Sequence, residues 1–71
     1  MSLSELVLQT RKRAKLSQQE LAALAGVGKT VVWDLEHGKR TIRFETLLKI
    51  LAVLNISLVL RSPIISEELA L

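Results

Sequence analysis

The sequence contains no cysteine and only one histidine among its 71 residues. Neither disulfides nor thiolate metal sites can therefore stabilise the fold, and one histidine cannot form a metal site alone. Aromatic residues are equally scarce, with one Trp and one Phe. The core must be aliphatic, and we expect the protein to use no cofactor and no metal.

A chain of this length forms one domain near the lower size limit for a single stable core. Hydrophobic residues nevertheless make up 49% of the sequence. So much apolar side chain on so short a chain indicates that part of it is buried between subunits.

Long uninterrupted hydrophobic runs are absent. The longest apolar stretch extends from Leu47 to Leu60, but polar residues such as Lys49 and Asn55 interrupt it, and it is too short to cross a bilayer. The chain begins with a polar, capped segment and lacks the basic and then apolar run of a signal peptide. We therefore expect a cytoplasmic protein that does not contact membranes and that associates with the nucleoid.

Acidic residues are few and unevenly placed, and the formal net charge is +3. Residues 1–61 contain all ten Lys and Arg but only five Asp and Glu, whereas residues 62–71 contain only Glu67 and Glu68. A basic body with a small acidic tail is typical of a domain that binds a polyanion and holds its tail away from it. A solvated basic surface is the alternative.

Residues 17–38 have the pattern of two short helices joined by a turn. Ser17 and Glu20 have the spacing of a capping box, which predicts the start of the first helix. Gly26 can adopt the left-handed conformation that ends it, and the second helix is predicted over about 29–37. This is the layout of a helix-turn-helix, whose second helix lies in the major groove of DNA.

Two further helices are predicted on either side of this unit. Ser2 or Ser4 can cap a helix at the amino terminus, whose basic last turn complements the helix dipole. A fourth helix is predicted from Arg43 or Phe44. Its apolar stripe comprises Leu47, Ile50, Leu51 and Leu54.

After Asn55 the apolar period changes to the alternation of a strand, over Ile56 to Leu60. A lone strand is unstable, and we identify no second strand in the sequence. We therefore expect Ile56, Leu58 and Leu60 to pair with the same strand of another subunit. Pro63 ends the strand, and residues 62–71 are predicted to be a flexible tail after a domain over 1–61.

The helix-turn-helix carries the candidate site. Gln18 lies in the first turn of the first helix of this unit, where its side-chain amide and the backbone N–H groups can bind a phosphate. In the second helix, Lys29 can donate to guanine and Thr30 can contact a thymine methyl or a phosphate. Asp34 can accept from cytosine, although its charge also repels phosphates. An ordinary solvated face is the alternative for Lys29 and Thr30.

Further candidates surround these residues. Trp33 either contacts DNA or packs sideways into the core or a dimer contact, and the sequence favours neither alternative. His37, Lys39 and Arg40 follow the helix and are expected to contact the DNA backbone. The residues expected at the DNA interface are thus Gln18, Gly28, Lys29, Thr30, Trp33, Asp34, His37, Lys39 and Arg40.

Several short motifs at fixed spacing resemble the phage-repressor-like (Xre/Cro) helix-turn-helix family. They are Arg11-Lys12, Leu16-Ser-Gln-x-Glu-Leu-Ala22, Gly26-Val27 and Val32-x-x-Leu-Glu36-x-Gly38-Lys39. The resemblance covers about residues 3–54 and implies an all-α fold, a compact bundle of four or five helices. It also implies a structural ion pair between Arg11 and Glu36.

The short strand after the last helix is most similar to HipB-type antitoxins. That resemblance implies a homodimeric repressor that binds a palindromic operator. It also implies that the same dimer binds a HipA-like kinase toxin. Two positions depart from the family pattern, since Gly28 replaces a Ser or Thr cap and Trp33 replaces a small polar residue. A stand-alone Xre-type regulator, and a protein-interaction antitoxin with weak DNA binding, are the alternative functions.

The segment Gly26-Val-Gly-Lys-Thr30 matches the end of a phosphate-binding loop. The first glycine of that motif is replaced by Ala23, and no strand precedes the segment. We therefore expect no nucleotide hydrolysis and no enzyme activity.

Overall fold

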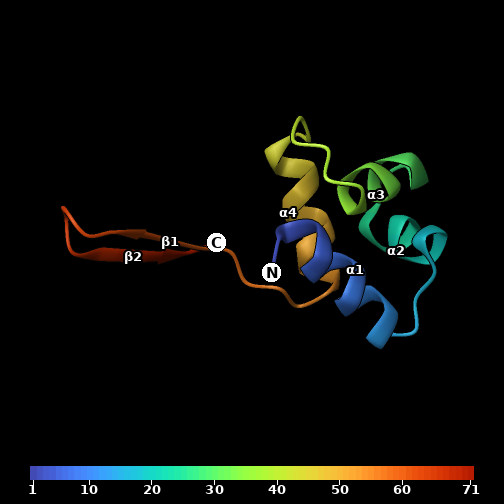
Figure 1. Cartoon of the computed structure of the whole chain (residues 1–71), viewed down its shortest axis with the longest axis horizontal. Coiled ribbons are helices and arrows are strands. Elements are labelled where there is room, and N and C mark those ends of the chain that lie inside the picture. Colours follow the sequence, from blue (N-terminus) through green and yellow to red (C-terminus); the bar gives the residue numbers. More distant parts are fainter.

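The computed structural model describes residues 1–71 as a helical body from which a two-stranded arm projects (Figure 1). The elements are α1 (Leu3–Arg13), α2 (Gln18–Ala25), α3 (Lys29–Glu36), α4 (Phe44–Val53), β1 (Val59–Ser62) and β2 (Glu67–Ala70). The four helices agree with the expected repressor-like bundle. None of them is both long and apolar enough to span a bilayer.

Serine side chains cap the first two helices, as the sequence predicts. Ser17 Oγ accepts a hydrogen bond from the Glu20 amide at 3.0 Å, and Glu20 Oε1 accepts one from the Ser17 amide at 2.8 Å. This reciprocal capping box fixes the start of α2. At α1 the cap is Ser2, whose Oγ accepts from the Glu5 amide at 3.1 Å.

All four helices end in the same way. A residue in the left-handed region follows each helix, and the next amide reaches back to a carbonyl five positions earlier, which is the Schellman motif. The left-handed residues are Lys15 (φ 60°), Gly26 (φ 72°), Gly38 (φ 85°) and Asn55 (φ 56°). The two glycines confirm the sequence prediction, whereas Lys15 takes this conformation without a glycine's freedom.

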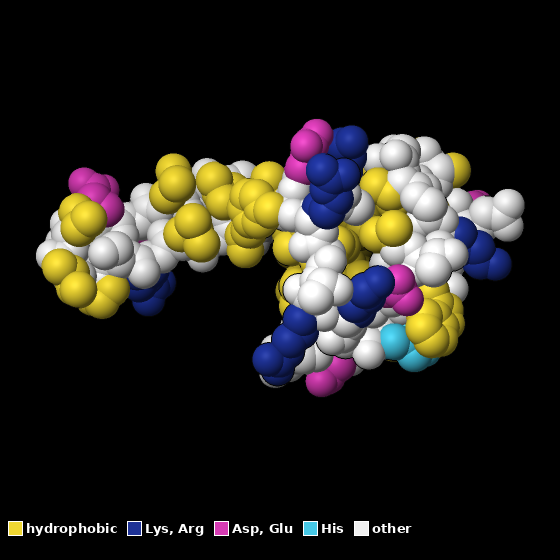
Figure 2. Space-filling model, turned by 90° about the horizontal axis from the view of Figure 1, so that it is seen from above, with side chains coloured by type: hydrophobic (Ala, Val, Ile, Leu, Met, Phe, Trp, Pro, Cys, Tyr) yellow, Lys and Arg dark blue, Asp and Glu magenta, His cyan; other side chains and the backbone are white.

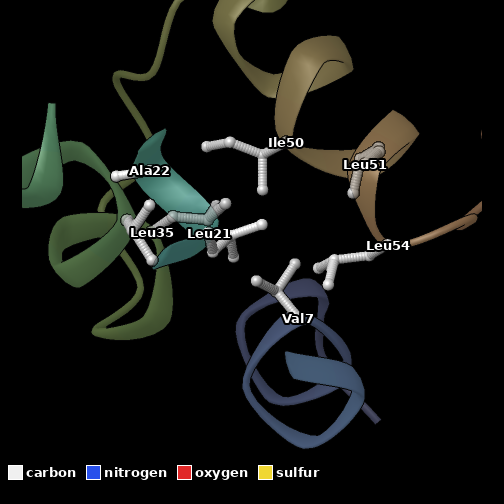
Figure 3. Packing of buried hydrophobic residues seen from close by; sticks show 8 residues of the cluster. Val7, Leu21, Ala22, Leu35, Ile50, Leu51 and Leu54 are labelled. Atoms are coloured by element: carbon white, nitrogen blue, oxygen red, sulfur yellow. The ribbon is translucent and has the colours of Figure 1, made fainter. Parts of the chain in front are cut away.

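The core lies where α2, α3 and α4 meet the middle of α1 (Figure 3). It is wholly aliphatic, as expected: Val7, Leu21, Ala22, Val32, Leu35, Ile50, Leu51 and Leu54. Ala22 is 3% exposed beside α3, where a larger side chain would separate the helices. The aromatic residues lie outside this core, since Trp33 is 49% and Phe44 55% exposed.

The C-terminal residues correct two sequence predictions. The strand starts at Val59 and pairs antiparallel with β2 of the same chain, with Leu60 opposite Leu69. The expectation that the chain has no second strand is therefore wrong, and residues 62–71 contribute β2 where a flexible tail was expected. The strand predicted at Ile56 begins later because Ile56 and Leu58 pack against the helical core.

We expect Leu21→Ala to lower the free energy of unfolding by about 2–5 kcal/mol, because it removes a fully buried side chain and leaves a cavity. Leu24→Ala on the same helix is the matched control. Leu24 is 64% exposed, so the same substitution there should cost less than about 0.5 kcal/mol. Chemical denaturation followed by circular dichroism measures both, and equal costs would contradict this orientation of α2.

Candidate nucleic-acid interface

One side of α3 and its cap faces solvent. Lys29, Thr30, Trp33 and His37 are all exposed, and at 100° per residue they fall within an arc of about 100°. Val32 and Leu35, both at most 2% exposed, anchor the opposite side in the core. The packing of α3 therefore presents these four side chains together, outward.

Trp33 and His37 form a stacked pair on this side. Their ring centroids are 3.6 Å apart and their planes differ by 16°. The Nδ1–H of His37 donates to the Trp33 carbonyl, with 2.7 Å between the heavy atoms. Since a carbonyl only accepts, this bond holds the proton on Nδ1 and leaves Nε2 without a partner in the chain. The core position considered for Trp33 is excluded by its exposure.

Asp34 lies at the edge of the exposed side and is partly buried. Its Oδ2 is 3.4 Å from the Nζ of Lys39, which follows the turn at Gly38. The ammonium offsets the repulsion that an isolated carboxylate would exert on phosphates. Arg40 is exposed and makes no ion pair.

The ion pair between Arg11 and Glu36 is present and nearly buried. Arg11 Nε is 2.6 Å from Glu36 Oε2 and Nη2 is 3.0 Å from Oε1, so the pair is bidentate. Arg11 Nη1 also donates to the carbonyl of Leu16 at 2.9 Å. The two side chains are 11% and 2% exposed. One contact set thus joins α1, the α1–α2 turn and the end of α3.

Gln18 extends this network. Its Nε2 donates to Glu36 Oε1 at 3.1 Å, so the side-chain amide that we expected at a phosphate holds Glu36 in place. The start of α2 is thereby fixed relative to the end of α3. Gly28 begins α3 with no side-chain cap bond, as its lack of a side chain requires.

The network governs the ionisation of Glu36. Burial opposes the charged form, but hydrogen bonds from Arg11 and Gln18, together with the charge of Arg11, outweigh it and hold the pKa of Glu36 below its ordinary value of 4.5. The hydrogen bond to Glu36 and the charge of Glu36 raise the pKa of Arg11 despite its burial. Both groups therefore stay charged at neutral pH.

The sequence did not reveal every residue that matters. The Leu16 carbonyl completes the Arg11 contacts, and no sequence signal points to a backbone acceptor. Leu69 and Leu71 lie along the arm beside β1. The alternation of leucine and small or acidic residues near the C-terminus is the signal that could have identified them.

The fold and the exposed side of α3 define a helix-turn-helix domain. The helix-turn-helix family HTH_3 matches residues 7–60, so the chain belongs to this family of DNA-binding transcriptional regulators. The match confirms the Xre-like resemblance, and the narrower HipB-type resemblance stays a prediction. The family assignment agrees with the expectation of a DNA-binding regulator.

Two kinds of relatives support the assignment. An uncharacterised HTH-type transcriptional regulator, y4mF of Sinorhizobium fredii (strain NBRC 101917 / NGR234), is 39% identical over 61 residues, which cover 86% of this chain and 80% of the relative. A crystal structure of SinR, the master regulator for biofilm formation, in complex with DNA is 33% identical with a TM-score of 0.70, covering 79% of this chain and 90% of that chain.

A complex of SinR with SinI is also similar, with a TM-score of 0.69 and 32% identity. The similarity covers 78% of this chain but only 54% of the matched chain. The shared part is therefore about half of that protein.

We expect Arg11→Ala to lower the free energy of unfolding by about 3–5 kcal/mol, because it leaves the buried carboxylate of Glu36 without its cation. Lys49→Ala is the control, since Lys49 lies 3.9 Å from Glu45 in an exposed pair. Its loss should cost at most about 0.5 kcal/mol. Denaturation curves of both variants measure the loss of unfolding free energy. Similar losses in the two variants would show that the Arg11 contacts contribute little to stability.

We also expect stability to fall in acid. A carboxylate whose folded pKa is lowered stabilises the protein fully above its unfolded pKa of 4.5, and this contribution is lost as the pH falls through the lower folded value. Glu36→Gln should therefore flatten the decline in unfolding free energy below about pH 4.5. The hydrogen bonds to Ser17 also lower the pKa of Glu20, so the comparison is between the slopes of the wild type and the Glu36→Gln variant. Parallel slopes would contradict the role of Glu36.

Proposed function

We propose that the protein is a sequence-specific transcriptional repressor that inserts α3 into the major groove of DNA. The single observation that carries this proposal is the exposed side of α3, where Lys29 and Thr30 are exposed and their side chains make no hydrogen bond or ion pair within the chain. The Arg11–Glu36 contacts hold this helix rigidly against the body. The similarity to SinR in complex with DNA supports the same mode of binding.

The roles of the residues follow from their positions. Lys29 lies at the start of α3 and donates to the O6 and N7 of guanine, while the methyl group of Thr30 contacts thymine. The Trp33 indole presents an apolar surface to a thymine methyl. Lys39 and Arg40, in the turn after α3, contact phosphates and add affinity without sequence information.

The remaining candidates support the backbone contacts. The first turn of α2, at Gln18, offers its backbone amides to a phosphate, as does the start of α3 at Gly28. The exposed His37 Nε2 lies on the same side of α3 and is placed to meet the DNA backbone. Asp34, paired with Lys39, acts mainly by orienting that lysine.

The protein acts as a homodimer in this proposal. Two copies of α3 related by a two-fold axis read the half-sites of a palindromic operator, which lie about 34 Å apart. The exposed apolar side chains of the arm, at the far end of the molecule from α3 (Figure 1), supply a surface for association.

A narrower role as an antitoxin with a HipA-like kinase partner stays a prediction, and a stand-alone regulator fits the same structure. The similarity to SinR in its complex with SinI favours a protein partner of some kind. A kinase gene beside this one, whose product co-purifies with this protein, would establish the antitoxin role. Absence of such a gene would favour the stand-alone regulator.

We expect Lys29→Ala to weaken binding to an operator, selected from a random pool of duplexes, by about 1–3 kcal/mol with little effect on random DNA. Lys39→Ala should weaken binding to both and reduce the slope of log K against log salt by about 1. Fluorescence anisotropy over a range of salt concentrations measures both.

Arg61→Ala is the control, because it removes the same charge from the arm, away from α3. It should leave both affinities nearly unchanged. If Lys29→Ala and Lys39→Ala reduce affinity equally on operator and random DNA, α3 is not the recognition helix.

A further inference from the structure

The pairing of the arm divides its side chains between two different faces. Cross-strand neighbours lie on the same face, and the Leu71 amide donates to the Leu58 carbonyl at 2.8 Å, one pair beyond the strand ends. One face therefore carries Leu58, Leu60, Leu69 and Leu71, with Ser62 and Glu67 at its tip, and we call it the leucine face. The opposite face carries Val59, Arg61, Glu68 and Ala70.

The two faces differ in polarity. Arg61 and Glu68 form an ion pair on the face opposite the leucine face, with 3.3 Å between Nε of Arg61 and Oε2 of Glu68. The leucine face has no charge along these four positions, yet Leu60, Leu69 and Leu71 are 50%, 56% and 49% exposed. Only Leu58, at its base, packs against the helical core. Hydrophobic side chains thus extend from the body along the arm (Figure 2).

An uncovered arm of this kind is not stable alone. Two strands without a third strand or a packed layer are at best marginally stable in water. The arm stands apart from the helical body (Figure 1), so the body does not supply that layer. The leucine face is therefore left uncovered in the single chain.

The exposed area matches what a second copy would bury. The accessible surface is 5297 Å², whereas a compact monomer of this mass exposes about 4,400 Å². The excess is close to the roughly 800 Å² that each partner buries in a stable interface. The radius of gyration is likewise 12.9 Å, against about 11 Å for a compact chain of this length.

We propose that the leucine face is covered by the leucine face of a second copy, packed face to face about a two-fold axis. This face is apolar except for Glu67 at its tip, so it suits an identical face. Antiparallel arms also carry each acidic tip, with Glu67 and Glu68, toward the basic body of the partner. This inference deepens the homodimer of the proposed function, and it replaces the strand-edge pairing expected from the sequence.

The decisive variants are Leu60→Glu and its matched control Val59→Glu. The two residues are adjacent in β1, are 50% and 46% exposed, and point to opposite faces. By light scattering, the wild type and Val59→Glu should have the mass of a dimer, and Leu60→Glu should show a two-fold lower mass. Unchanged helical circular dichroism shows that the body remains folded, since Leu60 lies outside the core.

A wild type with the mass of a monomer would overturn the proposal. So would a dimeric Leu60→Glu protein, which places the interface elsewhere, or dissociation by both variants, which points to pairing at the strand edge. Because the chain has no cysteine, Leu60→Cys provides a second test. It should cross-link to its own copy under mild oxidation faster than Val59→Cys, and an equal rate would also overturn the face-to-face arrangement.

DNA binding separates this inference from the proposed function. Monomeric Leu60→Glu should bind a duplex with a single half-site as tightly as the wild-type subunit, and should lose the extra affinity for the full palindrome. A dimer that binds neither duplex would leave the leucine face supported and contradict the recognition by α3.

Discussion

The nearly buried ion pair between Arg11 and Glu36 is the contact on which the geometry of this protein depends. Arg11 extends from α1, and Glu36 is the last residue of α3, so their bidentate contact joins the beginning of the bundle to the end of the exposed helix. Gln18 adds α2 to the same carboxylate. Breaking a buried pair leaves an unpaired charge, which is costly. The orientation of α3 is therefore strongly determined.

The aliphatic core and this polar network together fix the position of α3. Val32 and Leu35 fix which side of the helix is buried, and the polar contacts fix its end. As a result, the side chains that face solvent do not need to contribute to stability. Lys29 and Thr30 are exposed and unpaired by hydrogen bonds, and the exposed Trp33 and His37 stack on each other.

In the proposed dimer, the surface for association and the surface for DNA lie at different ends of the molecule. Its side chains contribute little to the helical core beyond the base at Leu58, and they lie away from α3 (Figure 1). In the proposed dimer, association through the arm would set the distance between the two copies of α3 without altering either of them. A two-fold axis would make that distance the same in every dimer.

Local signals in the sequence were sufficient for the helices and for the exposed side of α3. The capping box at Ser17, the glycines at 26 and 38 and the apolar periodicity act over a few residues, so they can be recognised without the fold. Only the folded chain shows that Glu67–Ala70 pairs with Val59–Ser62. The same holds for the left-handed conformation of Lys15 and for the hydrogen bond from Gln18 to Glu36. Each of these depends on partners brought together by the packing of whole elements, which short-range patterns do not encode.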